Sequence, residues 1–265
     1  LFDFCTPVLY VDLAVLHFYK NLYNFKKFNY HVIDSAENSR LRKFNVINVP
    51  KQDLVVAPGK NSTLASELAL ESLNLVVEDL KKNRIDLLVT LPVDKKSLSS
   101  VRSDFVGHTE YLLQSFGLNE NLMLLCSKKL KIATLTNHVS VSKIPELITK
   151  DGILNKLKIL TNSLIGDFLI QKPKIAILSL NPHCGDRGLI GAEEQCLIKP
   201  LIDDLQFSGH LVYGPYSADG FFGSRAYMKF DSVLAMYHDQ ALIPFKLLSF
   251  GAGVNYTAGL PIVRV

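Results

Sequence analysis

The sequence has 265 residues, of which 48% are hydrophobic and 20% charged, a composition typical of a globular chain with a large core. The net charge of +4 comes from scattered lysines without an interleaved aromatic stripe, so we expect no nucleic-acid partner. No apolar run approaches the roughly 18 residues needed to cross a bilayer, so we expect no membrane partner. The four cysteines show no CxxC spacing and are typical of reduced thiols, which favours a cytoplasmic location.

Taken in chain order, the hydrophobic pattern predicts helices alternating with short buried strands. Residues 62–83 have apolar side chains at helical spacing, with Ser62 as N-cap, and a strand is expected directly after them at 85–91. Further helices are expected at 109–116, 143–170 and 193–206, and further strands at 131–136, 174–180, 211–213 and 232–237. This alternation predicts an α/β fold with a largely parallel, mixed sheet and helices on both of its faces.

The molecule is expected to have two lobes, with an active-site cleft between them. Residues 1–105 plus 250–265 are expected to form the first lobe, incomplete at both ends, and residues 106–249 the second. The second lobe would carry the histidines described next and a dimer interface.

Three histidines, His138, His183 and His238, each follow one of the predicted strands. The carboxyl ends of parallel strands meet at one edge of a sheet, where ligands bind. Imidazole is the commonest protein ligand of divalent transition metals, so a catalytic metal site with open coordination positions is one interpretation. Hydrogen-bonded structural histidines are the other, and the sequence alone favours neither.

Several loops carry candidate binding residues. The loop 181–191 contains three glycines that permit close approach to a ligand, but its spacing is neither a dinucleotide fingerprint nor a P-loop, so no cofactor-binding residue is assigned. His108 and Thr109 open a predicted helix, where they suit a phosphate or carboxylate or simply cap the helix. Asp219, in a Gly-containing loop, either orients a ligand or only shapes the turn.

Two cations and an amide near the carboxyl end of the sequence also suit an anion: Lys246, Asn255 and Arg264. Scattered surface cations are the alternative. Lys246 lies among apolar neighbours, where a charge needs a reason, and we therefore interpret it as functional.

These motifs together resemble the 4-hydroxythreonine-4-phosphate dehydrogenase family, which is related in fold to isocitrate and isopropylmalate dehydrogenases. The matching segments are 58–60, 92–95, 107–112, 181–186, 193–194, 214–219, 237–240 and 253–264. The chain departs from the family at Ala241, where glycine is usual. The resemblance also leads us to expect a Gly-rich segment before Leu1 and an Asp-His-Gly-Thr segment after Val265.

The resemblance implies a homodimer with a shared active site. In such a site His138, His183 and His238 would hold a divalent metal (Zn, Co or Mg). A small phosphorylated substrate would bind to His108, Thr109, Lys246, Asn255 and Arg264. With NAD or NADP, the enzyme would oxidise 4-phosphohydroxy-L-threonine to a β-keto acid that decarboxylates to 3-amino-2-oxopropyl phosphate, in pyridoxal 5'-phosphate biosynthesis. Lys95, Asp219 and Lys246 are candidates for the catalytic base, and the sequence does not rank them.

Three alternatives remain open at this stage. One is a related dehydrogenase of an unphosphorylated hydroxy acid or a cis-diol. The second is a hydrolase in which three histidines hold a metal that activates water without a nicotinamide cofactor. The third is a metal- or phosphate-binding protein without catalytic activity.

Overall fold

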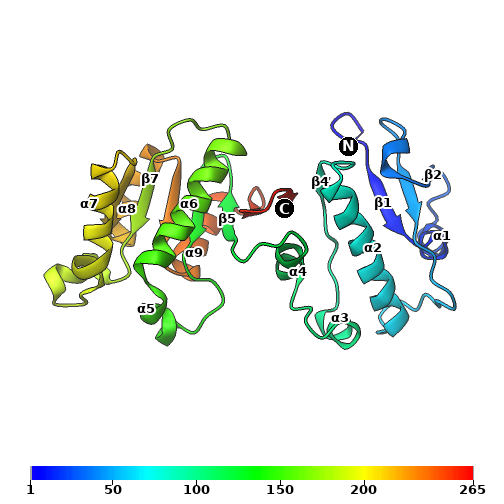
Figure 1. The fold of residues 1–265 in the computed structure, drawn as a ribbon, viewed down its shortest axis with the longest axis horizontal. Coiled ribbons are helices and arrows are strands. Elements are labelled where there is room, and N and C mark those ends of the chain that lie inside the picture. The colour runs from blue at the N-terminus through cyan, green and yellow to red at the C-terminus, as the bar shows by residue number, and fades with distance from the viewer. Residues whose placement is uncertain (1, 265) are drawn as a thin grey trace. The chain divides into compact units, whose positions relative to one another are not determined.

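The computed structural model describes residues 2–264 of the chain. Within them the chain forms two compact units, one of residues 2–117 with 262–264 and the other of residues 118–261 (Figure 1). No helix within the described residues is long and apolar enough to cross a membrane.

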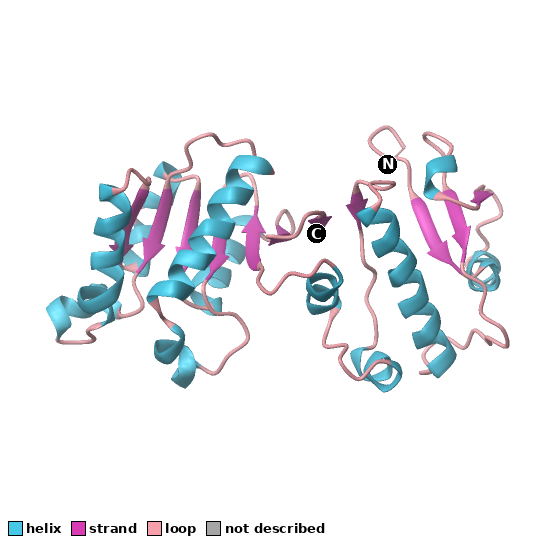
Figure 2. Ribbon diagram, in the orientation of Figure 1, coloured by secondary structure: helices cyan, strands magenta, loops and turns pink. Residues whose placement is uncertain are grey.

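The second unit is built on a six-stranded mixed sheet (Figure 2). Its strands lie in the order β10 (Val254–Ala258), β5 (Leu122–Cys126), β6 (Lys131–Thr134), β9 (Ser232–Ala235), β7 (Ile175–Leu178) and β8 (Val212–Tyr216). The four strands from β6 to β8 run parallel, whereas β5 is antiparallel to both of its neighbours. The predicted mixed, largely parallel sheet is confirmed.

Helices cover both faces of this sheet, also as predicted. One face packs against α5 (Ile144–Leu147), α6 (Lys150–Gly166) and α7 (Lys199–Phe207), and the other against α8 (Ala218–Gly223) and α9 (His238–Ser249). Ile132 and Val233, on the central strands, are fully buried. The ends of these central strands are therefore held by a continuous core.

Two of the expected helices are divided. The helix expected at 143–170 becomes the short turn η2 (Val141–Lys143), α5 and α6, because Pro145 starts α5 and Thr149 caps α6 by accepting a hydrogen bond from the Gly152 N–H at 3.1 Å. The helix expected at 193–206 begins as a π-helical turn, η4 (Glu194–Ile198), before α7.

The first unit contains two small sheets. In one, β1 (Val8–Val11), β3 (Asn45–Asn48) and β2 (His31–Ile33) lie parallel, and in the other β4 (Leu87–Leu88) pairs with β11 (Val263–Arg264). The helical elements are α1 (Leu13–Leu22), η1 (Ala36–Asn38), α2 (Thr63–Lys81), α3 (Lys95–Val101) and α4 (His108–Ser115).

The helix predicted at 62–83 is confirmed as α2, with Ser62 as its N-cap. The strand predicted at 85–91 is wrong in its extent and burial. Only Leu87–Leu88 is a strand, and Val89 and Leu91 are 63% and 70% exposed.

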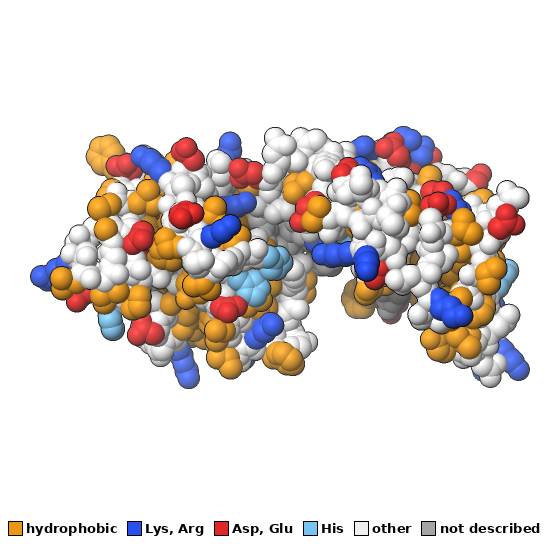
Figure 3. Space-filling model, turned by 90° about the horizontal axis from the view of Figure 1, so that it is seen from below, with side chains coloured by type: hydrophobic (Ala, Val, Ile, Leu, Met, Phe, Trp, Pro, Cys, Tyr) orange, Lys and Arg blue, Asp and Glu red, His pale blue; other side chains and the backbone are white. Residues whose placement is uncertain are grey.

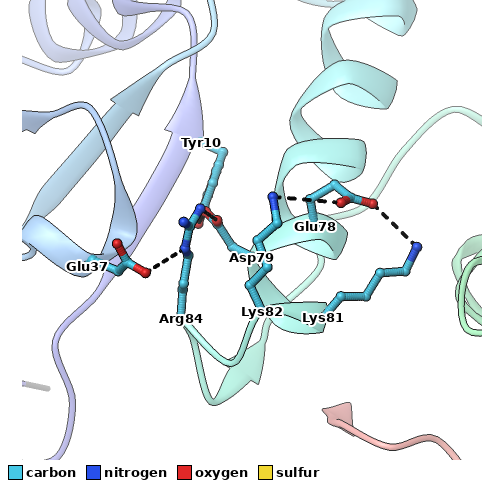
Figure 4. A network of polar contacts seen from close by, with 7 residues as sticks. All are labelled: Tyr10, Glu37, Glu78, Asp79, Lys81, Lys82 and Arg84. Carbon is cyan, nitrogen blue, oxygen red and sulfur yellow. Dashed lines mark hydrogen bonds and ion pairs between the residues drawn. The ribbon is translucent and has the colours of Figure 1, made fainter.

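A buried carboxylate ties α2 to the first sheet (Figure 4). The Tyr10 hydroxyl donates to Asp79 at 2.6 Å, and Arg84 pairs with Asp79 at 3.3 Å and with Glu37 at 2.8 Å. Burial and the contact with Asp79 raise the pKa of Tyr10, so its phenol stays protonated as the donor. Because Asp79 is only 9% exposed, loss of its partners would leave an unpaired buried charge.

The unit boundaries differ from the predicted lobes. Residues 106–117, which include α4, belong to the first unit, and residues 250–261 belong to the second. The second difference follows from β10, which pairs with β5 from Val254 to Ala258 and so extends the six-stranded sheet. Only residues 262–264 return to the first unit, through β11.

Candidate active site

The three candidate metal-binding histidines lie at the same edge of the six-stranded sheet. His138 follows β6, His238 opens α9 after β9, and His183 lies in the turn η3 (Pro182–Gly188) after β7. Since β6, β9 and β7 are adjacent and parallel, their carboxyl ends meet there, as the sequence predicts.

His138 and His238 lie side by side. Their ring centroids are 5.6 Å apart, and both rings line a depression of about 230 Å³, together with Asp239 and apolar side chains of neighbouring loops. Histidine side chains reach the molecular surface as a group in the space-filling view (Figure 3). The Asp239 carboxylate lies 2.7 Å from His238 Nδ1, a contact that engages one of the two ring nitrogens.

His183 stands on an unusual backbone. All five residues from His183 to Arg187 have left-handed φ angles, between 41° and 76°. Left-handed backbone costs roughly 1–2 kcal/mol for each non-glycine residue, so this turn needs support from its surroundings. The glycine at 185 is required, because a Cβ atom there would lie 2.5 Å from the Gly191 carbonyl oxygen.

The support comes from Glu194, which is 2% exposed. Its Oε1 accepts hydrogen bonds from the backbone N–H groups of Leu180 and Asn181, both at 2.8 Å, and its Oε2 accepts one from the Asn181 side chain at 3.0 Å. The same Oε2 lies close under the left-handed turn, 2.7 Å from where a Cβ atom of residue 185 would be. The buried Glu194 carboxylate thus has hydrogen-bond donors for both of its oxygens.

Asp219 lies on α8, near His183. The Ser217 hydroxyl, the backbone N–H of Gly220 and the charge of His183 together lower the pKa of Asp219. Asp219 is therefore ionised at neutral pH and ready to interact with a cation, but it is a weaker proton acceptor than an ordinary carboxylate.

Imidazole nitrogens suit a divalent transition metal. A single chain, however, places two of the candidate histidines together rather than a complete set of ligands. Within residues 2–264, no three His, Cys, Asp or Glu side chains of a single chain are grouped closely enough to hold an ion. His138 and His238 are the imidazoles that the structure places together.

In the first unit, a second group of candidate residues is brought together around Arg264. Arg264 lies on β11, and its Nη1 donates to the Thr109 hydroxyl at 2.9 Å. Burial, followed by the charges of Arg264 and Lys95, lowers the pKa of His108. The pKa of Arg264 is lowered by burial, which the negative charge of Glu110 opposes. Two cations, a hydroxyl and a neutral imidazole here suit an anionic group such as a phosphate.

The other two predicted substrate-binding residues, Lys246 and Asn255, lie in the second unit. Both are exposed, Lys246 on α9 and Asn255 on β10. The expectation that apolar neighbours bury Lys246 is wrong, because Ile243 and Leu247 are themselves 59% and 81% exposed. Because Lys246 is exposed, its charge needs no functional explanation, and burial no longer supports a role for it.

Three further residues of this region were given no role of their own from the sequence. They are Asp239, Glu194 and Gln240, and each acts through a hydrogen bond to a histidine or to the backbone at a strand end. All three belong to motifs that match the family pattern, at 193–194 and 237–240. The roles of these three residues depend on which atoms lie near them in the fold, and a sequence motif does not contain that information.

Comparison with known proteins yields a single family. The model of the family described as "Pyridoxal phosphate biosynthetic protein PdxA" matches residues 3–265. A 4-hydroxythreonine-4-phosphate dehydrogenase of Bacteroides thetaiotaomicron is 40% identical over 263 residues, which are 99% of this chain and 72% of that protein. The enzyme of the same name from a Sulfurihydrogenibium species is 41% identical over 212 residues, which are 80% of this chain and 65% of the relative. The family resemblance noted in the sequence is thus confirmed.

Solved structures agree with these sequence matches. A 4-hydroxythreonine-4-phosphate dehydrogenase from Klebsiella pneumoniae superposes with a TM-score of 0.88 at 29% identity, over 97% of this chain and 78% of that chain. The enzyme of the same name from Burkholderia phymatum gives a TM-score of 0.84 at 30% identity, over 98% and 79% of the two chains. A terephthalate 1,2-cis-dihydrodiol dehydrogenase from Burkholderia xenovorans shares the fold, with a TM-score of 0.65 at 20% identity.

Proposed function

This chain belongs to the PdxA family of pyridoxal phosphate biosynthetic proteins, and from that premise we propose that it is a 4-hydroxythreonine-4-phosphate dehydrogenase. It oxidises 4-phosphohydroxy-L-threonine with NAD or NADP to a β-keto acid, which decarboxylates to 3-amino-2-oxopropyl phosphate. The observation that carries the proposal is the family match over residues 3–265, together with relatives of that name at about 40% identity.

His138, His183 and His238 are the residues proposed to hold a divalent metal (Zn, Co or Mg). When bound, the metal would act as a Lewis acid toward the substrate hydroxyl, and the nicotinamide would accept the hydride. Since a single chain groups His138 with His238, we propose that a second copy of the chain completes the ligand set in a homodimer.

The phosphate of the substrate is proposed to bind at Arg264, Thr109 and His108. Arg264 offers a planar fork of donors, the Thr109 hydroxyl is already 2.9 Å from it, and Lys95 adds a second positive charge. The lowered pKa of His108 keeps its ring neutral at pH 7, so it donates one hydrogen bond without adding a third charge. Lys246 and Asn255 are also proposed to contact the substrate.

The proton of the substrate hydroxyl needs an acceptor, and Lys95, Asp219 and Lys246 remain the candidates. Asp219 is the weakest of these as a base, because its contacts stabilise the ionised carboxylate. We further propose a cytoplasmic location, with which the unbridged thiols of Cys126, Cys184 and Cys196 agree.

Turnover with defined components tests this function. The chain, stripped of metal with a chelator, is assayed with 4-phosphohydroxy-L-threonine for formation of reduced nicotinamide, with and without added Zn²⁺, Co²⁺ or Mg²⁺. We expect product only when substrate, nicotinamide and metal are all present. Turnover without a nicotinamide would instead indicate the metal-dependent hydrolase. Preference for the unphosphorylated compound would indicate the related hydroxy-acid or cis-diol dehydrogenase.

A further inference from the structure

The loops that carry the three histidines are joined by one continuous set of hydrogen bonds at the ends of their strands. Gln240 joins β9 to β7, because its Oε1 accepts from the Met236 N–H and its Nε2 donates to the Ser179 carbonyl, both at 2.7 Å. Thr136 joins β6 to β9, because its hydroxyl donates to the Met236 carbonyl at 2.8 Å.

The set continues from Ser179 to Glu194. The Ser179 hydroxyl donates to the Asn181 carbonyl at 2.8 Å, and the backbone N–H of Asn181 donates to Glu194 Oε1. Met236, Ser179 and Glu194 are 0%, 1% and 2% exposed, so water does not compete for these bonds.

The left-handed turn depends on the last member of this set. Glu194 binds the two backbone N–H groups that lead into the turn, and its carboxylate lies under Gly185 at the middle of it. The turn is also held by hydrogen bonds from the Cys184 thiol to the Pro215 carbonyl at 3.5 Å and from the Ile190 N–H to the Gly185 carbonyl at 3.0 Å. Together with these bonds, Glu194 offsets the unfavourable φ angles of His183 and its neighbours. A carboxylate buried beneath the loop therefore contributes to the position of the His183 side chain.

We propose that Glu194 and Gln240 are positioning residues for the metal-binding histidines: Glu194 holds the turn that presents His183, and Gln240 holds the ends of the strands from which the turn and the helix of His238 begin. This inference rests on the proposed metal-binding role of the three histidines. Metal ligands require donors placed within a few tenths of an ångström, so loss of such supports typically weakens metal binding about tenfold to a hundredfold.

The test compares two variants with two matched controls. Glu194→Gln keeps the size of the side chain but removes its charge, and Asp79→Asn does the same at the buried carboxylate of the first unit. Gln240→Leu removes the link between the strand ends. Gln206→Leu removes a glutamine that donates to the Val212 carbonyl at 2.8 Å, at the opposite end of β8 from the histidine loops.

Two quantities are measured for each protein: the dissociation constant for Zn²⁺ by competition with a chromogenic chelator, and the midpoint of thermal unfolding without metal. We expect Glu194→Gln and Gln240→Leu to bind Zn²⁺ about tenfold to a hundredfold more weakly than the wild type. The controls should lose thermal stability but keep the wild-type dissociation constant. The visible absorption of bound Co²⁺ should also change in Glu194→Gln, because it reports the ligand geometry.

Wild-type Zn²⁺ affinity in both Glu194→Gln and Gln240→Leu would overturn the inference, even if both are less stable. If Glu194→Gln does not fold, as judged by circular dichroism, the test rests on the Zn²⁺ dissociation constants of Gln240→Leu and its control Gln206→Leu. A wild-type chain that binds none of Zn²⁺, Co²⁺ and Mg²⁺ would contradict the proposed function itself, which separates the failure of that proposal from the failure of this one.

Discussion

The second unit presents its histidines at the ends of strands in one continuous sheet, whereas the first unit presents its cations at helix starts and on a two-residue strand. The central strands beneath the histidines are fully buried, and hydrogen bonds join their ends. In the first unit, β11 pairs with β4 over two residues only, and apolar residues such as Leu91 stay exposed. A metal needs donors at fixed distances, while the attraction between a cation and a phosphate falls off gradually with distance. The proposed metal ligands thus lie on the larger of the sheets, and the proposed phosphate ligands on a short strand and on helix starts.

Removing a histidine from the second unit should have the largest effect. His238→Ala or His183→Ala is expected to lower turnover by at least about a hundredfold, because the Lewis acid supplies several kcal/mol to the barrier reduction. The fold should persist, since both side chains lie outside the core. Metal content and circular dichroism are the measurements, with the exposed His210→Ala as control. Full metal occupancy in the alanine variants would exclude these residues as ligands.

Mixing two inactive variants tests whether the site is shared between chains. If His183 and His238 reach one metal from opposite chains, co-refolded His183→Ala and His238→Ala proteins should form hybrid dimers with one intact site. Up to about half the chains can pair in this way, so partial recovery of activity is expected, by the symmetry of a twofold dimer. A wild type that sediments as a monomer at full activity would rule out a shared site.

Substitutions in the first unit should act on the substrate rather than on the metal. Arg264→Ala is expected to raise KM for the phosphorylated substrate by an amount equivalent to about 2–5 kcal/mol, since it leaves a bound charge without its partner. Turnover of the unphosphorylated analogue and Zn²⁺ affinity should change little. Lys246→Ala should have a smaller effect on kcat/KM, because Lys246 is exposed. Equal losses with both substrates would argue against phosphate binding at Arg264.

The smallest expected effect is a shift in the titration of His108. Its pKa lies below the ordinary value of 6.5, through burial and through the charges of Arg264 and Lys95. Arg264→Gln, or inorganic phosphate bound to the wild type, should raise this pKa part of the way back, because the first removes a positive charge near the ring and the second adds a negative one. The pKa of His108 is measured by following its imidazole resonances by NMR as the pH is changed. If neither Arg264→Gln nor phosphate shifted this pKa, the phosphate would bind elsewhere.

The lowered pKa of His108 also makes the stability of the folded chain depend on pH. Between pH 6.5 and the lower pKa of the folded state, the unfolded chain binds a proton at residue 108 that the folded chain does not. Stability contributed by the neutral ring is thus present above pH 6.5 and is lost as the pH falls below it.

Local sequence patterns predicted those helices and strands whose structure depends mainly on their own residues. The apolar spacing and the cap at Ser62 predicted α2, and the placement of the three histidines followed from the alternation of strands and helices. The glycines of the loop 181–191 indicated unusual backbone angles, and Gly185 and Gly188 indeed have φ angles of 76° and 92°.

Features that depend on distant partners were not predictable in this way. The run at 85–91 has the composition of a buried strand, but only Leu87 and Leu88 pair, with Val263 and Arg264. Lys246 has apolar neighbours in sequence, yet side chains adjacent along a helix point in different directions, and this one is exposed. The role of Glu194 depends on two backbone N–H groups that precede it by more than ten residues.

X-ray absorption at the zinc edge, recorded on the chain loaded with Zn²⁺, tests the central claim most directly because it counts the atoms bound to the metal. We expect three imidazole nitrogens at about 2.0–2.1 Å, with the remaining positions filled by oxygen atoms. We also expect the loss of one imidazole in each of His138→Ala, His183→Ala and His238→Ala. Sulfur at about 2.3 Å, or an unchanged spectrum in any of the three variants, would contradict the assignment of these histidines as the metal ligands.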